Sequence, residues 1–140
     1  LVLAVRRALT AANLNANAVQ LVIGHGAATK HGDAAEWHAY HQIFTDKFPP
    51  VRFHKWCTGH LLGAASLYSV ALAYNQMQQR ACFPLPYFSH RFFHSVSHNR
   101  SPATNSLTAL QAMPTSYDCV LICAMGFGGN CAAIILRRTS

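Results

Sequence analysis

The sequence predicts an α/β fold in which a mixed sheet carries helices on its faces and ends in a β-hairpin. A short apolar run at 19–24 lacks helical spacing and is typical of a buried parallel strand. Such runs alternate with helical patterns along the chain. Two further apolar runs, 118–123 and 131–136, lie on either side of a glycine-rich turn and predict a hairpin. At 140 residues the chain forms one domain at most.

The first two helices follow from apolar residues that recur every three or four positions, over 1–13 and 34–44. Asp33 is the expected N-cap of the second helix. Glu36 then lies in its first turn, where the helix dipole favours a carboxylate.

After Pro49-Pro50, a short strand is expected at 51–55. The longest helix is expected from residue 59 or 61 to about 79, with Thr58 as its cap and His60 in its first turn. Its small residues Gly63, Ala64 and Ala65 predict a deeply buried start. Residues 82–87 are expected to be an extended edge segment, and 89–108 a loop.

The composition predicts a surface that another polypeptide covers. Hydrophobic residues make up 51% of the chain and charged residues only 11%, whereas about 25% is usual. The net charge of +7 permits an acidic partner. The five cysteines show no CxxC spacing, which indicates a reduced, cytoplasmic protein with mostly core cysteines. Neither a signal peptide nor a membrane span is expected.

Two histidines occupy positions that suit catalysis. His25 directly follows the first strand, and ligands of open α/β sheets bind at the carboxyl ends of strands. A strand-capping role for this histidine is an equal alternative. At the start of a helix, the dipole would keep His60 neutral, so that it could donate a hydrogen bond to an oxyanion. The alternative is an incidental histidine in a tight loop.

Three motifs occur in order: His-Gly-Ala-Ala-Thr-Lys-His-Gly-Asp-Ala-Ala-Glu at 25–36, Lys-Trp-Cys-Thr-Gly-His-Leu-Leu-Gly-Ala-Ala at 55–65, and Gly-Phe-Gly-Gly at 126–129. With the apolar strand that follows, they resemble the C-terminal half of a β-ketoacyl-acyl-carrier-protein synthase of the thiolase-like superfamily. The resemblance covers nearly all of residues 1–140. It implies an acyltransferase that condenses malonyl-carrier with an enzyme-bound acyl thioester, with loss of carbon dioxide, in fatty acid or polyketide biosynthesis.

The resemblance also assigns roles to residues. His25 and His60 would stabilise the enolate, and Lys55 would be the active-site lysine with Glu36 as its acidic partner. Phe127 matches a gatekeeping phenylalanine whose N–H contributes to an oxyanion hole. Substrate-binding positions are Thr29, Gly128 and Gly129. No resident cofactor or metal is implied, because phosphopantetheine arrives on the acyl carrier protein. The other implied partner is the N-terminal half of the synthase, in a homodimer or heterodimer.

The chain also departs from the family pattern. Ala27 replaces a threonine, Ala124-Met125 replaces Ser-Phe, and Asn130-Cys131 replaces Thr-Asn. The family's nucleophilic cysteine belongs to the N-terminal half. Cys57 is interpreted as a packing residue, so the isolated chain is expected to be inactive.

Three alternatives stay open. A non-catalytic chain-length-factor-like partner, or a truncated pseudoenzyme, would keep this fold. A zinc site could use His90, His94 and His98, or His38 and His41, but no acidic cluster supports it. A nucleic-acid interface is disfavoured because no Lys/Arg run exceeds two residues.

Overall fold

The computed structural model describes residues 1–82 and 114–139. Its core is a four-stranded sheet with strand order β2-β1-β3-β4. The strands are β1 (Leu21–Ile23), β2 (Val51–Arg52), β3 (Cys119–Met125) and β4 (Cys131–Arg137). Strand β1 is parallel to both β2 and β3, and β4 is antiparallel to β3. The predicted mixed sheet with a closing hairpin is therefore confirmed.

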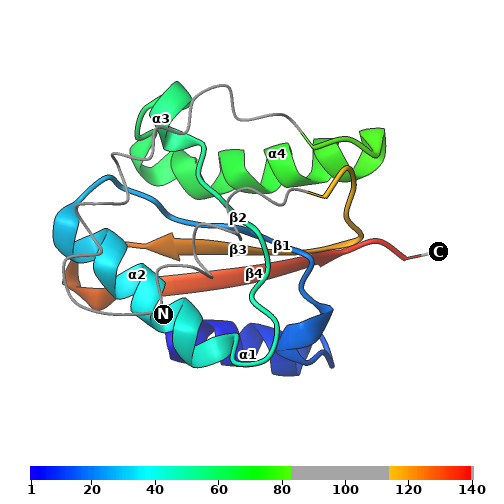
Figure 1. Ribbon diagram of the computed structural model, residues 1–140. Coiled ribbons are helices and arrows are strands. Elements are labelled where there is room, and N and C mark those ends of the chain that lie inside the picture. Colours follow the sequence, from blue (N-terminus) through cyan, green and yellow to red (C-terminus); the bar gives the residue numbers. More distant parts are fainter. Residues whose placement is uncertain (83–113, 140) are drawn as a thin grey trace.

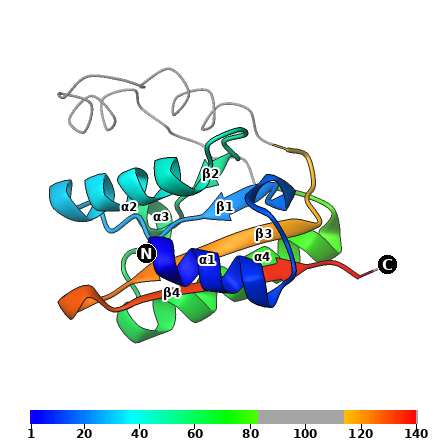
Figure 2. The ribbon, with the colours of Figure 1, turned by 90° about the horizontal axis from the view of Figure 1, so that it is seen from below.

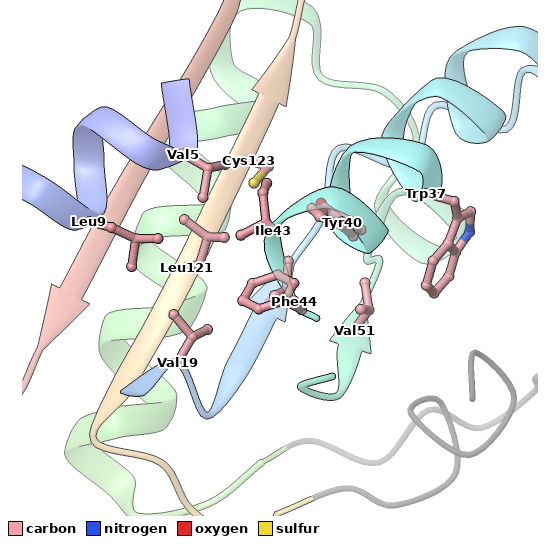
Figure 3. Packing of buried hydrophobic residues seen from close by; sticks show 11 residues of the cluster. Val5, Leu9, Val19, Trp37, Tyr40, Ile43, Phe44, Val51, Leu121 and Cys123 are labelled. Carbon is pink, nitrogen blue, oxygen red and sulfur yellow. The ribbon is translucent and has the colours of Figure 1, made fainter. Parts of the chain in front are cut away.

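Helices cover both faces of this sheet. Helices α1 (Val2–Ala11) and α2 (Lys30–Ile43) lie on one face, and α4 (Ala65–Gln79) lies on the other (Figures 1 and 2). Successive side chains along each strand point to opposite faces of the sheet and therefore pack against different helices. Leu121 and Cys123 of β3 face α1 and α2 (Figure 3), whereas Val120 and Ile122 pack on the α4 side. The central strands are apolar at consecutive positions because both faces are buried.

Helix α2 begins earlier than predicted, at Lys30, and its N-cap is Thr29 rather than Asp33. The Asp33 N–H donates to the Thr29 carbonyl (2.9 Å), which places Asp33 in the first turn. Gly32 makes this early start possible, since a Cβ at that position would lie 2.4 Å from the Thr29 hydroxyl oxygen. The expected role of Asp33 as a cap was wrong because the glycine was interpreted as part of a loop.

The predicted continuous helix from 59 or 61 to 79 is also wrong at its start. Residues Lys55–Thr58 form a separate short helix, α3, which ends at Gly59 with a positive φ of 71°. Only glycine adopts such a conformation readily. A 3₁₀ turn, Leu62–Ala64, then leads into α4 at Ala65. His60 therefore lies in a connecting loop, and Thr58 does not cap α4.

One face of α4 is apolar and exposed within this chain. Its inner face, which includes Ala65, Ser69, Ala73 and Met77, is buried, but the side chains of Leu67 and Tyr74 are 72% and 59% exposed. The preceding Leu61–Ala64 segment is exposed as well, contrary to the predicted deep burial. A contiguous apolar surface of this kind is typical of a surface that a partner covers.

Several expectations lie outside the described residues, namely most of the 82–87 segment, the 89–108 loop and the histidines at 90, 94 and 98. Over residues 1–82 and 114–139, no group of three potential metal ligands occurs. No helix in those same ranges is long and apolar enough to cross a bilayer.

We expect the isolated 140-residue chain to self-associate through the exposed face of α4. The variant Leu67→Gln/Tyr74→Gln should shift it towards monomer, because it removes apolar surface without touching the buried face. Sedimentation velocity would measure the change. Leu3→Gln is the matched control, since Leu3 is 61% exposed on α1. An equal response from the control would contradict a specific role for α4.

Candidate functional site

The candidate site lies where three parallel strands end at the same edge of the sheet. His25 follows β1 after one glycine, Lys55 follows β2 after two residues, and the 126–129 turn follows β3 directly. The register pairs Ile23 with Arg52 and with Ile122, so β1 and β2 end at the same level, and β3 continues in the same direction for three more residues, to Met125. The carboxyl edge of a parallel sheet is the usual ligand site of α/β folds.

The rings of His25 and His60 lie side by side, with centroids 5.4 Å apart and planes at 74°. The Leu62 N–H donates to Nδ1 of His60 (3.0 Å). Nδ1 of His25 lies 3.5 Å from the Lys55 Nζ, whose ammonium can only donate. In the neutral form of each ring, Nδ1 is therefore the acceptor and the proton is on Nε2. Two imidazole rings that can each donate from Nε2–H therefore lie next to each other.

His25 is neutral at physiological pH. Burial, the Lys55 ammonium and then His60 lower its pKa to about 4. His60 is exposed in this chain. A neutral imidazole donates a hydrogen bond without carrying a net charge, and two such donors can stabilise negative charge that develops on an oxygen atom.

Lys55 links the beginning of α3 to the loop after β1. Its Nζ donates to the carbonyl oxygen of His25. Burial lowers the pKa of Lys55, while the carboxylates of Glu36 and Asp33 act in the opposite direction. Lys55 therefore supplies positive charge beside His25 and fixes the backbone that carries it.

Glu36 acts on the same backbone from the opposite side. Its carboxylate accepts from the N–H groups of His25 (2.6 Å) and Gly26 (2.9 Å), and from the Tyr40 hydroxyl (2.5 Å). The residue is 1% exposed, and burial raises its pKa against these three hydrogen bonds. The predicted pairing with Lys55 is not a direct ion pair within the described residues. Glu36 and Lys55 instead hold the N–H and C=O of one residue, His25.

Two glycines of the His25 loop pack against Phe53, a residue that the sequence analysis did not single out. A Cβ at Gly24 would lie 2.4 Å from the Phe53 ring, and one at Gly26 would lie 2.2 Å from it. Gly26 also has a positive φ of 48°. Close packing against the aromatic ring thus requires glycine on both sides of His25. Tyr40 was also missed, although its position four residues after Glu36 places both on one helix face.

The remaining predicted residues lie in the 126–129 turn, at the start of α2 and on α3. The 126–129 turn contains a 3₁₀ turn, Phe127–Gly129, with positive φ at Gly128 and Gly129. Phe127 is fully exposed and has no ring contact with either histidine in the described part of the chain. Thr29 is exposed at the start of α2, and its side chain makes no capping hydrogen bond. Cys57 is exposed, so its interpretation as a packing residue was wrong; its Sγ donates to the His54 carbonyl (3.0 Å).

The fold and this arrangement define the class of protein: the chain belongs to the β-ketoacyl synthase C-terminal domain family, whose pattern it matches over residues 2–88. It is 30% identical, over 118 residues, to 3-oxoacyl-[acyl-carrier-protein] synthase 1 from two Escherichia coli strains, K12 and O6:H1. That alignment covers 81% of this chain and 26% of each relative. The chain therefore spans about a quarter of the length of these relatives.

The fold is also found in a solved structure, that of the ishigamide ketosynthase/chain length factor. The TM-score is 0.76 at 22% identity, over 97% of this chain and 32% of that one. The predicted thiolase-like architecture is therefore confirmed.

We expect Glu36→Gln to destabilise the chain by about 2 kcal/mol, in the range of a lost hydrogen bond to a charged group. The amide would turn an N–H donor towards the backbone N–H of His25 or Gly26. Urea unfolding followed by circular dichroism would measure the change. Asp46→Asn removes an exposed carboxylate and should change stability by less than about 0.5 kcal/mol. Equal effects of the two substitutions would contradict the role given to Glu36.

The pKa values of His25 and His54, both about 4, predict a stability that falls as pH drops from 6.5 to 4. In this window the unfolded chain binds protons that the folded histidines reject. Glu36 and Asp33, whose pKa values burial raises, contribute with the opposite sign. The contribution of the two histidines is therefore obtained by comparing how the free energy of unfolding depends on pH in the native chain and in the variant His25→Gln/His54→Gln. NMR titration measures both pKa values directly, and ordinary values near 6.5 would contradict the prediction.

Proposed function

We propose that this chain forms the enolate-stabilising part of a β-ketoacyl-acyl-carrier-protein synthase. The observation that carries the proposal is the adjacent imidazole rings of His25 and His60 at the carboxyl edge of the sheet, each with a donor beside its Nδ1. The proposed reaction is a decarboxylating Claisen condensation of malonyl-carrier with an enzyme-bound acyl thioester, in fatty acid or polyketide biosynthesis. The E. coli relatives carry the name of a synthase of this kind.

In the proposed reaction, the carbon–carbon bond to the malonyl carboxylate breaks and carbon dioxide leaves. The electron pair forms an enolate, whose oxygen accepts hydrogen bonds from the two Nε2–H groups. The enolate carbon then attacks the acyl thioester, and the enzyme thiolate leaves. Both histidines must be neutral donors at the outset, and the lowered pKa of His25 supports this state. Losing one such donor typically costs about 3–4 kcal/mol.

The nucleophile of this reaction comes from outside the described site. Cys119 and Cys123 are buried in the sheet, and burial raises the pKa of both thiols. Cys57 is exposed, with its Sγ turned to a backbone carbonyl. By resemblance to the family, we assign the acyl-bearing cysteine to an N-terminal half of the synthase, which would also cover α4. Phe127, Gly128 and Gly129 would contribute the oxyanion-hole turn, and Thr29 the contact with the phosphopantetheine arm of an acyl carrier protein. No resident cofactor is proposed.

The alternative is a chain-length-factor-like partner that keeps the fold without catalysis. The replacements at Ala27, Ala124-Met125 and Asn130-Cys131 favour it, since they remove hydroxyl groups at or near the proposed substrate path. The intact pairing of His25, His60 and Lys55 favours the synthase. Decarboxylation of a malonyl thioester distinguishes the two, because only the synthase requires these donors.

In the protein as naturally expressed, His25→Ala or His60→Ala should each lower the rate of carbon dioxide release from malonyl-carrier by about 10²–10³-fold. Cys57→Ser is the matched control and should keep the rate, because it lies between Lys55 and His60 in the sequence without a proposed role. Decarboxylation that survives either histidine substitution would rule out the synthase role. Absence of decarboxylation in the native protein would favour the non-catalytic partner.

A further inference from the structure

His54 is a buried histidine beside the site that the proposed reaction does not use. It is 6% exposed and lies between the end of β2 and the start of α3, directly before Lys55. Its ring contacts the ring of Tyr68 on α4, with centroids 5.1 Å apart. Its carbonyl oxygen accepts from the N–H groups of Cys57 (3.0 Å) and Thr58 (3.2 Å). This one residue therefore connects a strand end with two helices.

The imidazole of His54 has hydrogen-bond partners on both helices. Nε2 lies 2.6 Å from the Ser69 hydroxyl oxygen on α4, and Nδ1 lies 3.2 Å from the Thr58 hydroxyl oxygen on α3. The Ser69 hydroxyl donates its own proton to the Ala65 carbonyl (3.1 Å). It must therefore accept from Nε2–H, which fixes the tautomer of a neutral ring. Burial and the neighbouring Lys55 ammonium lower the pKa of His54 to about 4, in agreement with a neutral ring.

The short helix α3 depends on this connection. It has only four residues and a single stabilising turn, and it contains no buried residue. Helices of this length are not stable on their own. Lys55 is its first residue, and the Lys55 ammonium must reach the His25 carbonyl across the sheet edge. The position of Lys55 thus depends on how α3 is held against α4.

We propose that His54 is a positioning residue that holds Lys55 against His25 by fastening α3 to Ser69 of α4. This rests on the proposed function only for its effect on catalysis, because the geometry of Lys55 and His25 can be measured without a reaction. Loss of the Ser69 hydroxyl would leave the buried Nε2–H of His54 without its acceptor, which is costly. The His54 ring and α3 would then shift, and Lys55 would move away from His25.

The test compares Ser69→Ala with the matched control Ser66→Ala on the same helix. In the 140-residue chain, Ser69→Ala should raise the NMR-measured pKa of His25 towards 6.5, because a positive charge leaves its neighbourhood. In a Lys55→Met background, Ser69→Ala should leave the pKa of His25 unchanged. Ser66→Ala should have no effect in either background. Thr58→Val removes the partner of Nδ1 at a half-buried site, and should shift the pKa in the same direction if Ser69→Ala does not fold.

A purely structural role would lower the melting temperature in both backgrounds without a Lys55-dependent change in the pKa of His25. That outcome would overturn the proposal, as would a shift of equal size in the Lys55→Met background. In the protein as naturally expressed, Ser69→Ala should lower kcat for decarboxylation by about tenfold to a hundredfold with little change in KM, as expected for a misplaced group. A native protein without decarboxylation would refute the proposed function, while the pKa measurement would still decide the role of His54.

Discussion

The structure depends on the position of strand β1 between its two parallel neighbours, β2 and β3. Strand β1 lies between β2 and β3, and the two neighbours pair with it in register at Ile23. Because all three strands run in the same direction, the residues that follow them meet at one edge. Histidine, lysine and the glycine-rich turn come from positions 25, 55 and 126–129, yet the parallel strands direct all three towards the same edge of the sheet. Strand β1 is buried at all three of its positions, because apolar residues cover both of its faces.

At that edge, the backbone of His25 is held more firmly than its side chain. Glu36 accepts its N–H, Lys55 donates to its carbonyl, and Phe53 packs against the glycines on either side. A carboxylate and an ammonium thus act on opposite ends of one residue. In this arrangement the two charged groups fix the backbone of His25 and leave its imidazole Nε2–H available to a ligand. In a direct Glu36–Lys55 ion pair, the two groups would bind each other and would not hold the backbone. Preorganised donors of this kind cost no reorganisation when charge develops.

The sequence could predict the sheet and the site motifs because both leave local signals. Runs of apolar residues mark the strands, and His25 directly follows one of them. The loop from Thr58 to Ala65 could not be predicted from a helical pattern. Its small and apolar residues resemble a helix start, but the positive φ of Gly59 separates α3 from α4. Likewise Asp33 resembled a cap because Gly32 before it is typical of a loop, whereas α2 in fact begins before that glycine, at Lys30.

His54, Tyr40 and Phe53 were missed for a different reason. Each acts through a contact made in space, with Ser69, Glu36 and Gly26 respectively, and none belongs to a motif that stands out in the sequence. The helical period can place Tyr40 on the same helix face as Glu36, but it cannot predict which residues elsewhere in the chain contact that face. The contact between His54 and Ser69 joins residues fifteen positions apart across a loop. Such contacts follow from the packing of helices and become visible only in the folded chain.

The net positive charge of the chain explains why the histidines near Lys55 need to be neutral. The chain has only four acidic residues against eleven lysines and arginines. Two of the four act electrostatically on Lys55: Asp33, in the first turn of α2, and Glu36, which lies in the second turn and not in the first as expected. A second positive charge near Lys55 would oppose it, so the neighbouring histidines must stay neutral. Burial of His25 and His54 provides this, and the Lys55 ammonium reinforces it. In a chain with such an excess of positive charge, neutral histidines allow several nitrogen donors to gather at one site without mutual repulsion.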